Sequence, residues 1–307
     1  MDSIWKRIWR YRYLYLMGLP GILFFLIFCY LPMGGIVVAF QNYQPWLGIF
    51  KSPWVGFEWF KQFFTLPQTL TYLKNTILVN GAKFIIGFPI TIIFAILLSE
   101  LIHKPFKKVV QTISYFPYFL SWAAIYGLMF SLLNPTYGLV NNLIAFFGGQ
   151  KINFLISTKW FIPLVAISSL WKYLGWGTII YLAAISGLNT ELYEAANIDG
   201  ANRFQRIWHV TLPGMLPTIT ILLVLQIGSL MNSDFTQLQA MLGSGNGTKA
   251  ILYPVGQVID TWAYMTGIQG GQISFAAAGS LFKNVIVVIL MLGTNWIVKK
   301  SGQEGLI

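Results

Sequence analysis

Charged residues are scarce in this sequence: Asp, Glu, Lys and Arg make up 9% of the 307 residues. A soluble globular domain carries about 25% charged residues, so this chain cannot cover the surface of a water-soluble globule of its size. Its hydrophobic content of 56% and its mean hydropathy of +0.65 point the same way. The composition predicts a membrane-embedded protein and excludes secreted disulfide scaffolds, disordered proteins and ordinary cytosolic enzymes.

Residues that form disulfides or bind metals are equally rare. The sequence has one cysteine, Cys29, which lies in an apolar run, so a disulfide framework and a cysteine metal site are excluded. The two histidines, His103 and His209, are far apart in the sequence. We therefore expect no metal site in this chain.

Catalytic and nucleotide-binding patterns are also missing. A nucleotide-hydrolysing chain needs the string G-x-x-x-x-G-K-[ST], whose backbone amides hold phosphates. The nearest string, residues 243–249, lacks the adjacent Gly and Lys. No Ser/His/Asp arrangement or carboxylate pair stands out, so we do not expect an enzyme.

Long apolar runs, by contrast, are frequent. A helix needs about 20 mostly apolar residues to cross a hydrocarbon core of ~30 Å. Six segments meet this requirement: 13–40, 72–98, 107–133, 160–185, 214–231 and 274–298. We therefore expect an all-α polytopic membrane protein with six transmembrane helices. Its parts would be a basic interfacial segment over 1–12, a transmembrane domain over 13–298 and a tail over 299–307.

The excess of positive charge predicts the orientation. The chain has 20 Lys and Arg against 9 Asp and Glu, a net charge of +11. In a membrane protein such an excess is typical of cytoplasmic loops, so no nucleic-acid partner is expected. If the N-terminus is cytoplasmic, the inner segments, among them the short loop 100–108, hold most of the cations outside the spans. We expect both termini in the cytoplasm, with segment 1–12 resting on membrane lipid.

The cytoplasmic segment between the fourth and fifth spans, residues 187–213, has the pattern of two short helices joined by a turn. Asn189 or Thr190 is placed to cap the first helix. Asp199 and Gly200 supply the turn, because glycine readily adopts the left-handed conformation that ends many helices. This segment is expected to lie outside the bilayer.

The second helix of this segment carries an apolar ridge. Phe204, Ile207 and Trp208 share one face by their i, i+3, i+4 spacing. We expect Pro213 to end this helix before the fifth span begins. The ridge suits a groove on a partner protein, or it packs on the span ends of this chain.

The same segment resembles the EAA loop of permease subunits in binding-protein-dependent ABC importers. Val210 stands where that family usually has isoleucine. Segments 15–24, 55–60 and 275–279 are similar to the carbohydrate-uptake branch, in particular to its polysaccharide-type permeases, which are related to the maltose permeases. The matching loop residues are Glu194, Ala195, Ala196, Gly200, Ala201, Phe204, Leu212 and Pro213.

The resemblance implies a type I ABC importer permease fold in a bacterial cytoplasmic membrane, and import of an oligosaccharide. The loop would contain the coupling helix, which docks on a cytoplasmic ATPase. The implied partners are a second permease subunit, two ATPase subunits and an extracytoplasmic solute-binding protein. ATP and Mg²⁺ would be bound by the ATPase subunits, so no cofactor is expected in this chain. The alternative is a stand-alone secondary transporter or channel for small polar solutes.

Three lysines, Lys83, Lys172 and Lys283, fall within predicted spans. A lysine at the centre of a transmembrane helix costs about 2.5–3.5 kcal/mol, and no acidic residue lies within a predicted span. We therefore expect these lysines to face the substrate pathway, or to pair with helix carbonyls or with acids of the second permease. Lys83 and Lys172 are the better pathway candidates, and they favour an anionic oligosaccharide such as one that contains uronic acids.

Polar residues near the outer end of the fifth span are further candidates for the pathway. Asn232 and Asp234 lie at that end, and Gln226 lies about one and a half turns deeper. At this depth such groups either bond sugar hydroxyls or simply meet water.

Overall fold

The computed structural model describes residues 9–242, 246–302 and 305. Within these ranges the chain forms helices and loops, with no β-strand and one isolated bridge between Gln41 and Trp54. It divides into two units: Met1–Leu66 with Ala263–Phe282, and Pro67–Trp262 with Lys283–Ile307. The predicted segments 1–12, 243–249 and 299–307 lie partly outside the described residues.

The first unit begins with one continuous helix, Arg12–Phe40. Proline cannot donate a hydrogen bond, and its ring collides with the carbonyl four residues earlier. A π turn directly precedes Leu31-Pro32, and the N–H of Leu31 bonds the carbonyl of Leu26, five residues back. This wider turn lets the helix continue through Pro32. The parts of the helix are α2 (Arg12–Phe25), a π turn (Leu26–Tyr30), α3 (Leu31–Met33) and a 3₁₀ turn (Gly34–Phe40).

Aromatic rings pack the rest of the first unit. The ring of Phe40 lies 5.3–5.7 Å from those of Trp54, Phe57 and Phe60. The Trp59 indole N–H donates to the carbonyl of Gln41 at 2.9 Å. The remaining elements of this unit are α4 (Gly48–Lys51), α5 (Glu58–Thr65), a π turn (Met265–Gln269) and the start of α17 (Ile273–Lys300).

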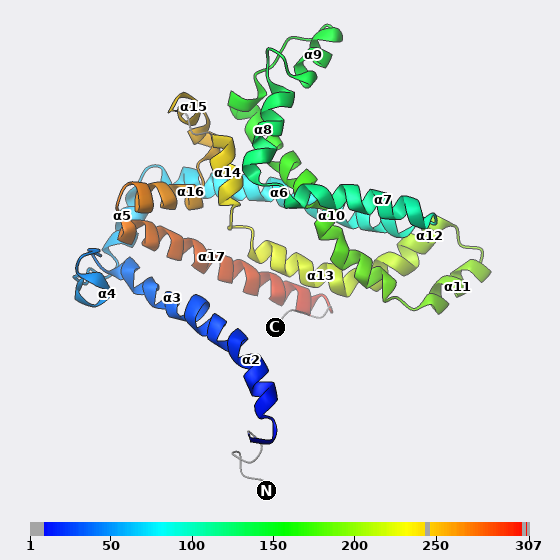
Figure 1. The fold of residues 1–307 in the computed structure, drawn as a ribbon, viewed down its shortest axis with the longest axis horizontal. Helices are drawn as coiled ribbons and strands as arrows, with labels where there is room; N and C mark the ends of the chain where they lie inside the picture. The colour runs from blue at the N-terminus through cyan, green and yellow to red at the C-terminus, as the bar shows by residue number, and fades with distance from the viewer. Residues whose placement is uncertain (1–8, 243–245, 303–304, 306–307) are drawn as a thin grey trace. The chain divides into compact units, whose positions relative to one another are not determined.

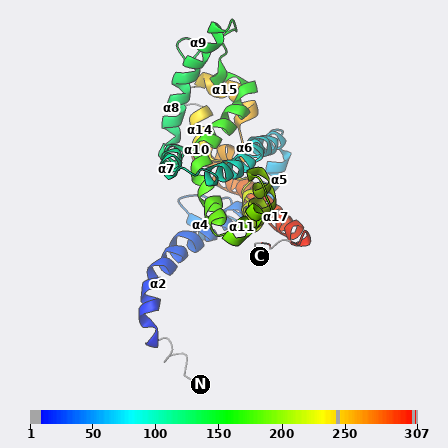
Figure 2. The ribbon, with the colours of Figure 1, turned by 90° about the vertical axis from the view of Figure 1, so that its right-hand side faces the viewer.

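The second unit holds the other helices and the second part of α17. Figures 1 and 2 show α8, α9 and α15 on one side of α6. The elements are α6 (Thr69–Ser99), α7 (Lys104–Tyr115), a 3₁₀ turn (Phe116–Phe119), α8 (Trp122–Leu133), α9 (Leu139–Phe146), a 3₁₀ turn (Phe154–Ile156), α10 (Thr158–Ser186), α11 (Thr190–Ile198), α12 (Arg203–Arg206), a π turn (Ile207–Thr211), α13 (Leu212–Gly228), α14 (Phe235–Leu242), α15 (Asn246–Gly256) and most of α16 (Ile259–Tyr264).

The helices α6 and α10 pack against each other. Glycines set how closely α10 approaches its neighbours. A Cβ on Gly177 would lie 3.1 Å from the Thr91 side chain on α6. A Cβ on Gly175 would lie 2.1 Å from the carbonyl oxygen of Ser114 on α7. Such small residues are what lets transmembrane helices come together, since lipid supplies no hydrophobic drive between them.

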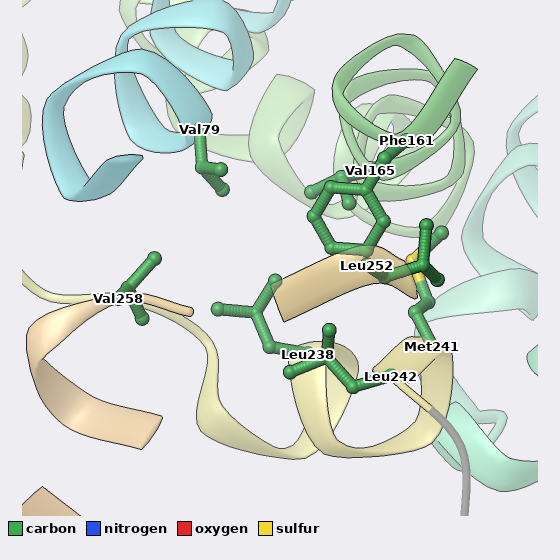
Figure 3. Packing of buried hydrophobic residues seen from close by; sticks show 8 residues of the cluster. All are labelled: Val79, Phe161, Val165, Leu238, Met241, Leu242, Leu252 and Val258. Carbon is green, nitrogen blue, oxygen red and sulfur yellow. The ribbon is translucent and has the colours of Figure 1, made fainter. Parts of the chain in front are cut away.

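Two apolar clusters hold the α6–α10 pair at separate points along its length. The first joins α6 and α10 to α14, α15 and the residue before α16 (Figure 3): Val79, Phe161, Val165, Leu238, Met241, Leu242, Leu252 and Val258. The second joins them to α13: Ile92, Ala95, Ile96, Tyr181 and Met215. The stretch of α6 between the clusters, residues 80–91, is free to carry polar side chains.

The predicted spans correspond to helices, with one correction. In the part of the chain that the structure describes, four helices are long and apolar enough to cross a membrane: Arg12–Phe40, Thr69–Ser99, Arg203–Gly228 and Ile273–Lys300. The predicted span 107–133 is not one straight helix, because Lys104–Phe119 and Trp122–Leu133 meet at an angle of 105° and would together form a fifth crossing. The backbone is extended at Leu120, and Ser121 caps α8 by accepting from the N–H of Ala124. The predicted span 160–185 forms α10, which is 29 residues long but less apolar.

Candidate functional site

A cavity of about 540 Å³ lies between α6, α10 and α13. Its size falls in the range of about 300–1,000 Å³ that is typical of small-molecule sites. The α6 wall is a stripe with helical spacing: Asn80, Lys83, Phe84, Gly87, Phe88 and Thr91. The α10 wall consists of Ser169, Leu170, Tyr173, Leu174, Gly177, Ile180 and Tyr181. The third wall consists of Leu222, Gln226, Ser229, Leu230, Asn232, Ser233 and Asp234.

Four of the six predicted pathway residues line this cavity. They are Lys83, Gln226, Asn232 and Asp234, which come from two different helices and from the segment that follows α13. Lys172 and Lys283 are not among its lining residues. The three lysines within the predicted spans therefore have three different surroundings.

Asp234 is a hydrogen-bond hub on the cavity wall. Its Oδ2 accepts from Trp122 Nε1 at 2.6 Å and from the Tyr173 hydroxyl at 2.9 Å. Its Oδ1 accepts from the Thr236 hydroxyl at 2.7 Å and from the backbone N–H of Gln237 at 3.2 Å. A carboxylate has about four acceptor positions, so the bonding capacity of Asp234 is used.

These bonds also decide the charge of Asp234. Burial alone would raise the pKa of its carboxyl, but the hydrogen bonds from Thr236, Tyr173, Gln237 and Trp122 outweigh burial and lower the pKa below its ordinary value. The group is therefore an anion at neutral pH. It ties the start of α8 and the middle of α10 to the segment between α13 and α14.

Lys172 lies at the break in the third predicted span. Its Nζ donates to the carbonyl of Tyr118 at 3.0 Å and to that of Leu120. The ammonium also lies 5.4–5.9 Å from the ring centroids of Tyr118, Trp122 and Tyr173, within the range of cation–π attraction. It satisfies carbonyls that the broken helix leaves without intrahelical partners. Of the alternatives for Lys172, the structure supports pairing with carbonyls.

Lys283 forms an ion pair with Asp260 of the same chain. This partner was not among the expected ones, because α16 brings an acid from outside the predicted spans to α17. The other carboxylate oxygen of Asp260 accepts from the backbone N–H of Ser233 at 2.8 Å. The Ser233 hydroxyl in turn accepts from Asn80 Nδ2 at 2.9 Å.

Lys83 differs from the other two lysines. It lines the cavity from α6 and is partly exposed to it. Among the described residues it has no hydrogen-bond or ion-pair partner, although the negative charge of Asp234 stabilises its ammonium group.

Several lining residues were missed in the sequence. Tyr173 and Tyr181 are two turns apart on α10, and together with Ser169 and Gly177 they recur every four residues, which gives a weak signal of a polar stripe. The hydroxyl of Tyr181 is buried and has no partner among the described residues. Trp122 gave no signal, because its contact with Asp234 joins residues 112 positions apart.

The loop 187–213 forms the predicted two helices and the turn between them. Asn189 caps α11, its Oδ1 accepting from the backbone N–H of Glu191 at 3.0 Å. Gly200 has φ +75°, the left-handed conformation that glycine tolerates best. Asn202 and Gln205 form a capping box at the start of α12. Glu194, Ala195 and Ala196 lie on α11, and Ala201 follows the turn.

Pro213 does not end the second helix, as the sequence had suggested. The helix runs without interruption from Arg203 to Gly228. As at Pro32, a π turn precedes the Leu-Pro pair, and the N–H of Leu212 bonds the carbonyl of Ile207. The wider turn makes room for the proline ring, so the loop and the fifth span form one rod.

The three residues of the predicted apolar ridge have different surroundings in this helix. Ile207 packs against the cluster around Met215. The side chains of Phe204 and Trp208 are 73% and 58% exposed, and their rings stack 6.4 Å apart. The two rings therefore form an exposed apolar surface on this loop. The same loop forms a hollow of about 320 Å³ lined by Ala196, Asp199, Gly200, Ala201, Gln205, Arg206, His209 and Val210.

These features define a multi-pass membrane permease, and comparison with known proteins agrees. The chain belongs to the family of binding-protein-dependent transport system inner membrane components, whose model matches residues 87–303. It is 45% identical over 295 residues to the polygalacturonan/rhamnogalacturonan transport system permease protein YteP of Bacillus subtilis (strain 168), which covers 96% of this chain and 90% of that protein. The predicted family and the all-α permease fold are thereby confirmed.

Two solved structures are also similar. One is a bacterial alginate ABC transporter in complex with alginate pentasaccharide-bound periplasmic protein, with a TM-score of 0.88, 35% identity and coverage of 99% of this chain and 100% of that one. The other is a bacterial ABC transporter involved in the import of the acidic polysaccharide alginate, with a TM-score of 0.86, 36% identity and coverage of 97% and 99%.

Proposed function

We propose that this chain is a permease subunit of an ATP-driven importer that passes an acidic oligosaccharide inward through the cavity between α6, α10 and α13. The cavity carries the proposal, because it combines amide and hydroxyl groups, aromatic rings and the ammonium of Lys83, which has no partner among the described residues. Amides and hydroxyls suit sugar hydroxyls, and an ammonium suits a carboxylate. The names of the similar proteins, which transport polygalacturonan or alginate, support an acidic substrate.

The energy would come from other chains. We infer two cytoplasmic ATPase subunits, one of which would dock on α11, α12 and the exposed rings of Phe204 and Trp208. A second permease subunit and an extracytoplasmic solute-binding protein would complete the transporter. ATP and Mg²⁺ would be bound by the ATPase subunits. A secondary transporter or channel that acts alone would leave these exposed rings without a role.

Transport in proteoliposomes tests the proposal. The complete complex, with its binding protein, should import uronate-containing oligosaccharides at the expense of ATP. Import of neutral oligosaccharides alone would contradict the substrate class. Import by this chain without any ATPase would contradict the coupling and favour the stand-alone alternative.

The proposed orientation places both termini and the loop 187–213 in the cytoplasm. It can be tested in a Cys29→Ser background by labelling single cysteines in intact cells. Asn246→Cys should react with a membrane-impermeant maleimide from outside, and Asn202→Cys only after permeabilisation. External labelling at position 202 would overturn the orientation and the docking surface with it.

A further inference from the structure

Within the proposed acidic-oligosaccharide pathway, we propose that Lys83 alone, of the three lysines in the predicted spans, binds the carboxylate of the transported sugar. The inference rests on the proposed function and adds to it the residue that selects charge. It follows from how the hydrogen-bonding capacity of each charged group near the cavity is used.

The ammonium groups of Lys172 and Lys283 are already engaged. Lys172 donates to the backbone carbonyls of Tyr118 and Leu120 and faces aromatic rings. Lys283 is paired with Asp260, and its side chain is only 10% exposed. To bind a sugar, either lysine would have to leave buried partners that then remain unsatisfied, which is costly.

Lys83 has no such bond to lose among the described residues. It lines the cavity and has no hydrogen-bond or ion-pair partner in the part of the chain that the structure describes. Asp234 attracts it from across the cavity, but both oxygens of that carboxylate already accept two bonds each. The three N–H donors of Lys83 are therefore available to an anion that enters the cavity.

The neighbours of Lys83 leave room for a sugar ring. Gly87 lies one turn further along α6, and a Cβ built there meets no atom within 4 Å. Phe84 and Phe88 are on the same stripe, with ring centroids 5.4 Å apart and planes 30° from each other. A cavity wall that offers an ammonium and two aromatic rings suits a uronate, which has a charged edge and an apolar ring face.

Asp234 would determine which wall of the cavity the sugar carboxylate faces. Its negative charge is held in place by four donors on the wall formed by the segment after α13. A sugar carboxylate would be repelled from that wall and attracted to Lys83. A neutral sugar would gain from neither charge, so the pair discriminates between acidic and neutral substrates.

The test compares an acidic trisaccharide with its methyl ester, which keeps the sugar rings and removes the charge. Both are presented to the complete transporter in proteoliposomes at concentrations that saturate the binding protein. We expect Lys83→Gln to lower the initial uptake of the acid by about 10-fold or more, the weight of a charge-assisted bond. Uptake of the ester should stay unchanged, and Lys83→Arg should retain most of the acid uptake.

Lys74→Gln is the matched control, since Lys74 is an exposed lysine on the same helix. It should change neither uptake. Equal loss of acid and ester uptake in Lys83→Gln would make Lys83 structural, and no loss would remove it from the pathway; either result overturns this inference alone. If wild type imports only the ester, the proposed function fails as well. Should Lys83→Gln not accumulate in the membrane, Lys83→Met takes its place, since an apolar side chain is easily accommodated in a span. A ratio of acid to ester uptake below that of wild type would support the inference, and a wild-type ratio would overturn it.

Discussion

Lys172 donates a hydrogen bond of 3.0 Å to the backbone carbonyl of Tyr118, across the break in the third predicted span. Residues 54 positions apart are joined here, and the contact turns a lysine that reads as a pathway residue into a structural one. A cation placed on free helix carbonyls lets a bent helix persist without water. The break lies next to Trp122, which holds Asp234 at the cavity.

Replacing Lys172 with Gln should therefore weaken the fold rather than change substrate preference. Its charge-assisted bonds to carbonyls are worth about 1.5–3 kcal/mol, so we expect a lower thermal-unfolding midpoint of the purified complex and an equal loss of acidic and neutral uptake. Lys159→Gln, an exposed lysine of the same helix α10, is the control and should behave as wild type. Selective loss of acidic uptake in Lys172→Gln would return this lysine to the pathway.

The ion pair between Lys283 and Asp260 should show strong coupling. Removing one partner of a buried pair leaves an uncompensated charge and costs about 3–5 kcal/mol. We expect Asp260→Asn and Lys283→Met each to reduce thermal stability sharply, and the double variant to lose less than the sum of the two. Additive losses in this double-mutant cycle would show that the two side chains do not interact in the membrane.

Two glycines offer a matched test of helix packing. A Cβ on Gly175 would lie 2.1 Å from the Ser114 carbonyl oxygen, which belongs to the α7 backbone and cannot yield easily. Gly175→Ala should therefore separate α7 from α10 and strongly reduce the amount of folded permease. Gly87→Ala, where a Cβ meets nothing within 4 Å, should leave expression and folding intact. Normal accumulation of the Gly175→Ala protein, measured by size-exclusion of the solubilised chain, would contradict the close approach.

The turn at Gly200 should be essential for coupling and dispensable for insertion. Its φ of +75° is closed to proline, whose ring fixes φ near −65°. We expect Gly200→Pro to abolish uptake and weaken co-purification of the ATPase, while the chain still reaches the membrane. Phe204→Ala should weaken the same association, since that ring is 73% exposed. Normal uptake by both variants would mean that the ATPase docks elsewhere.

Much of this architecture could be predicted from local sequence. The scarcity of charge predicts membrane embedding, because a polar surface needs charged residues. The loop 187–213 was predicted nearly to its caps, since Asn189 and Gly200 act within a few residues of their own position. The ends of Arg12–Phe40, Thr69–Ser99 and Ile273–Lys300 lie within a few residues of the predicted spans. The break in 107–133 and the start of the fifth-span helix at Arg203 were not predicted.

What only the tertiary structure decided are the roles of polar residues whose partners lie far away in the sequence. The three lysines look alike in their apolar runs, yet Lys172 meets carbonyls 52 and 54 residues away and Lys283 meets an acid on α16. By local rules Pro213 would end the helix, but the π turn before it removes the clash between the proline ring and the backbone of the preceding turn. A buried charge without a partner is costly. The fold supplies partners for Lys172 and Lys283, and it places Lys83 at the cavity, where an anion can bind it.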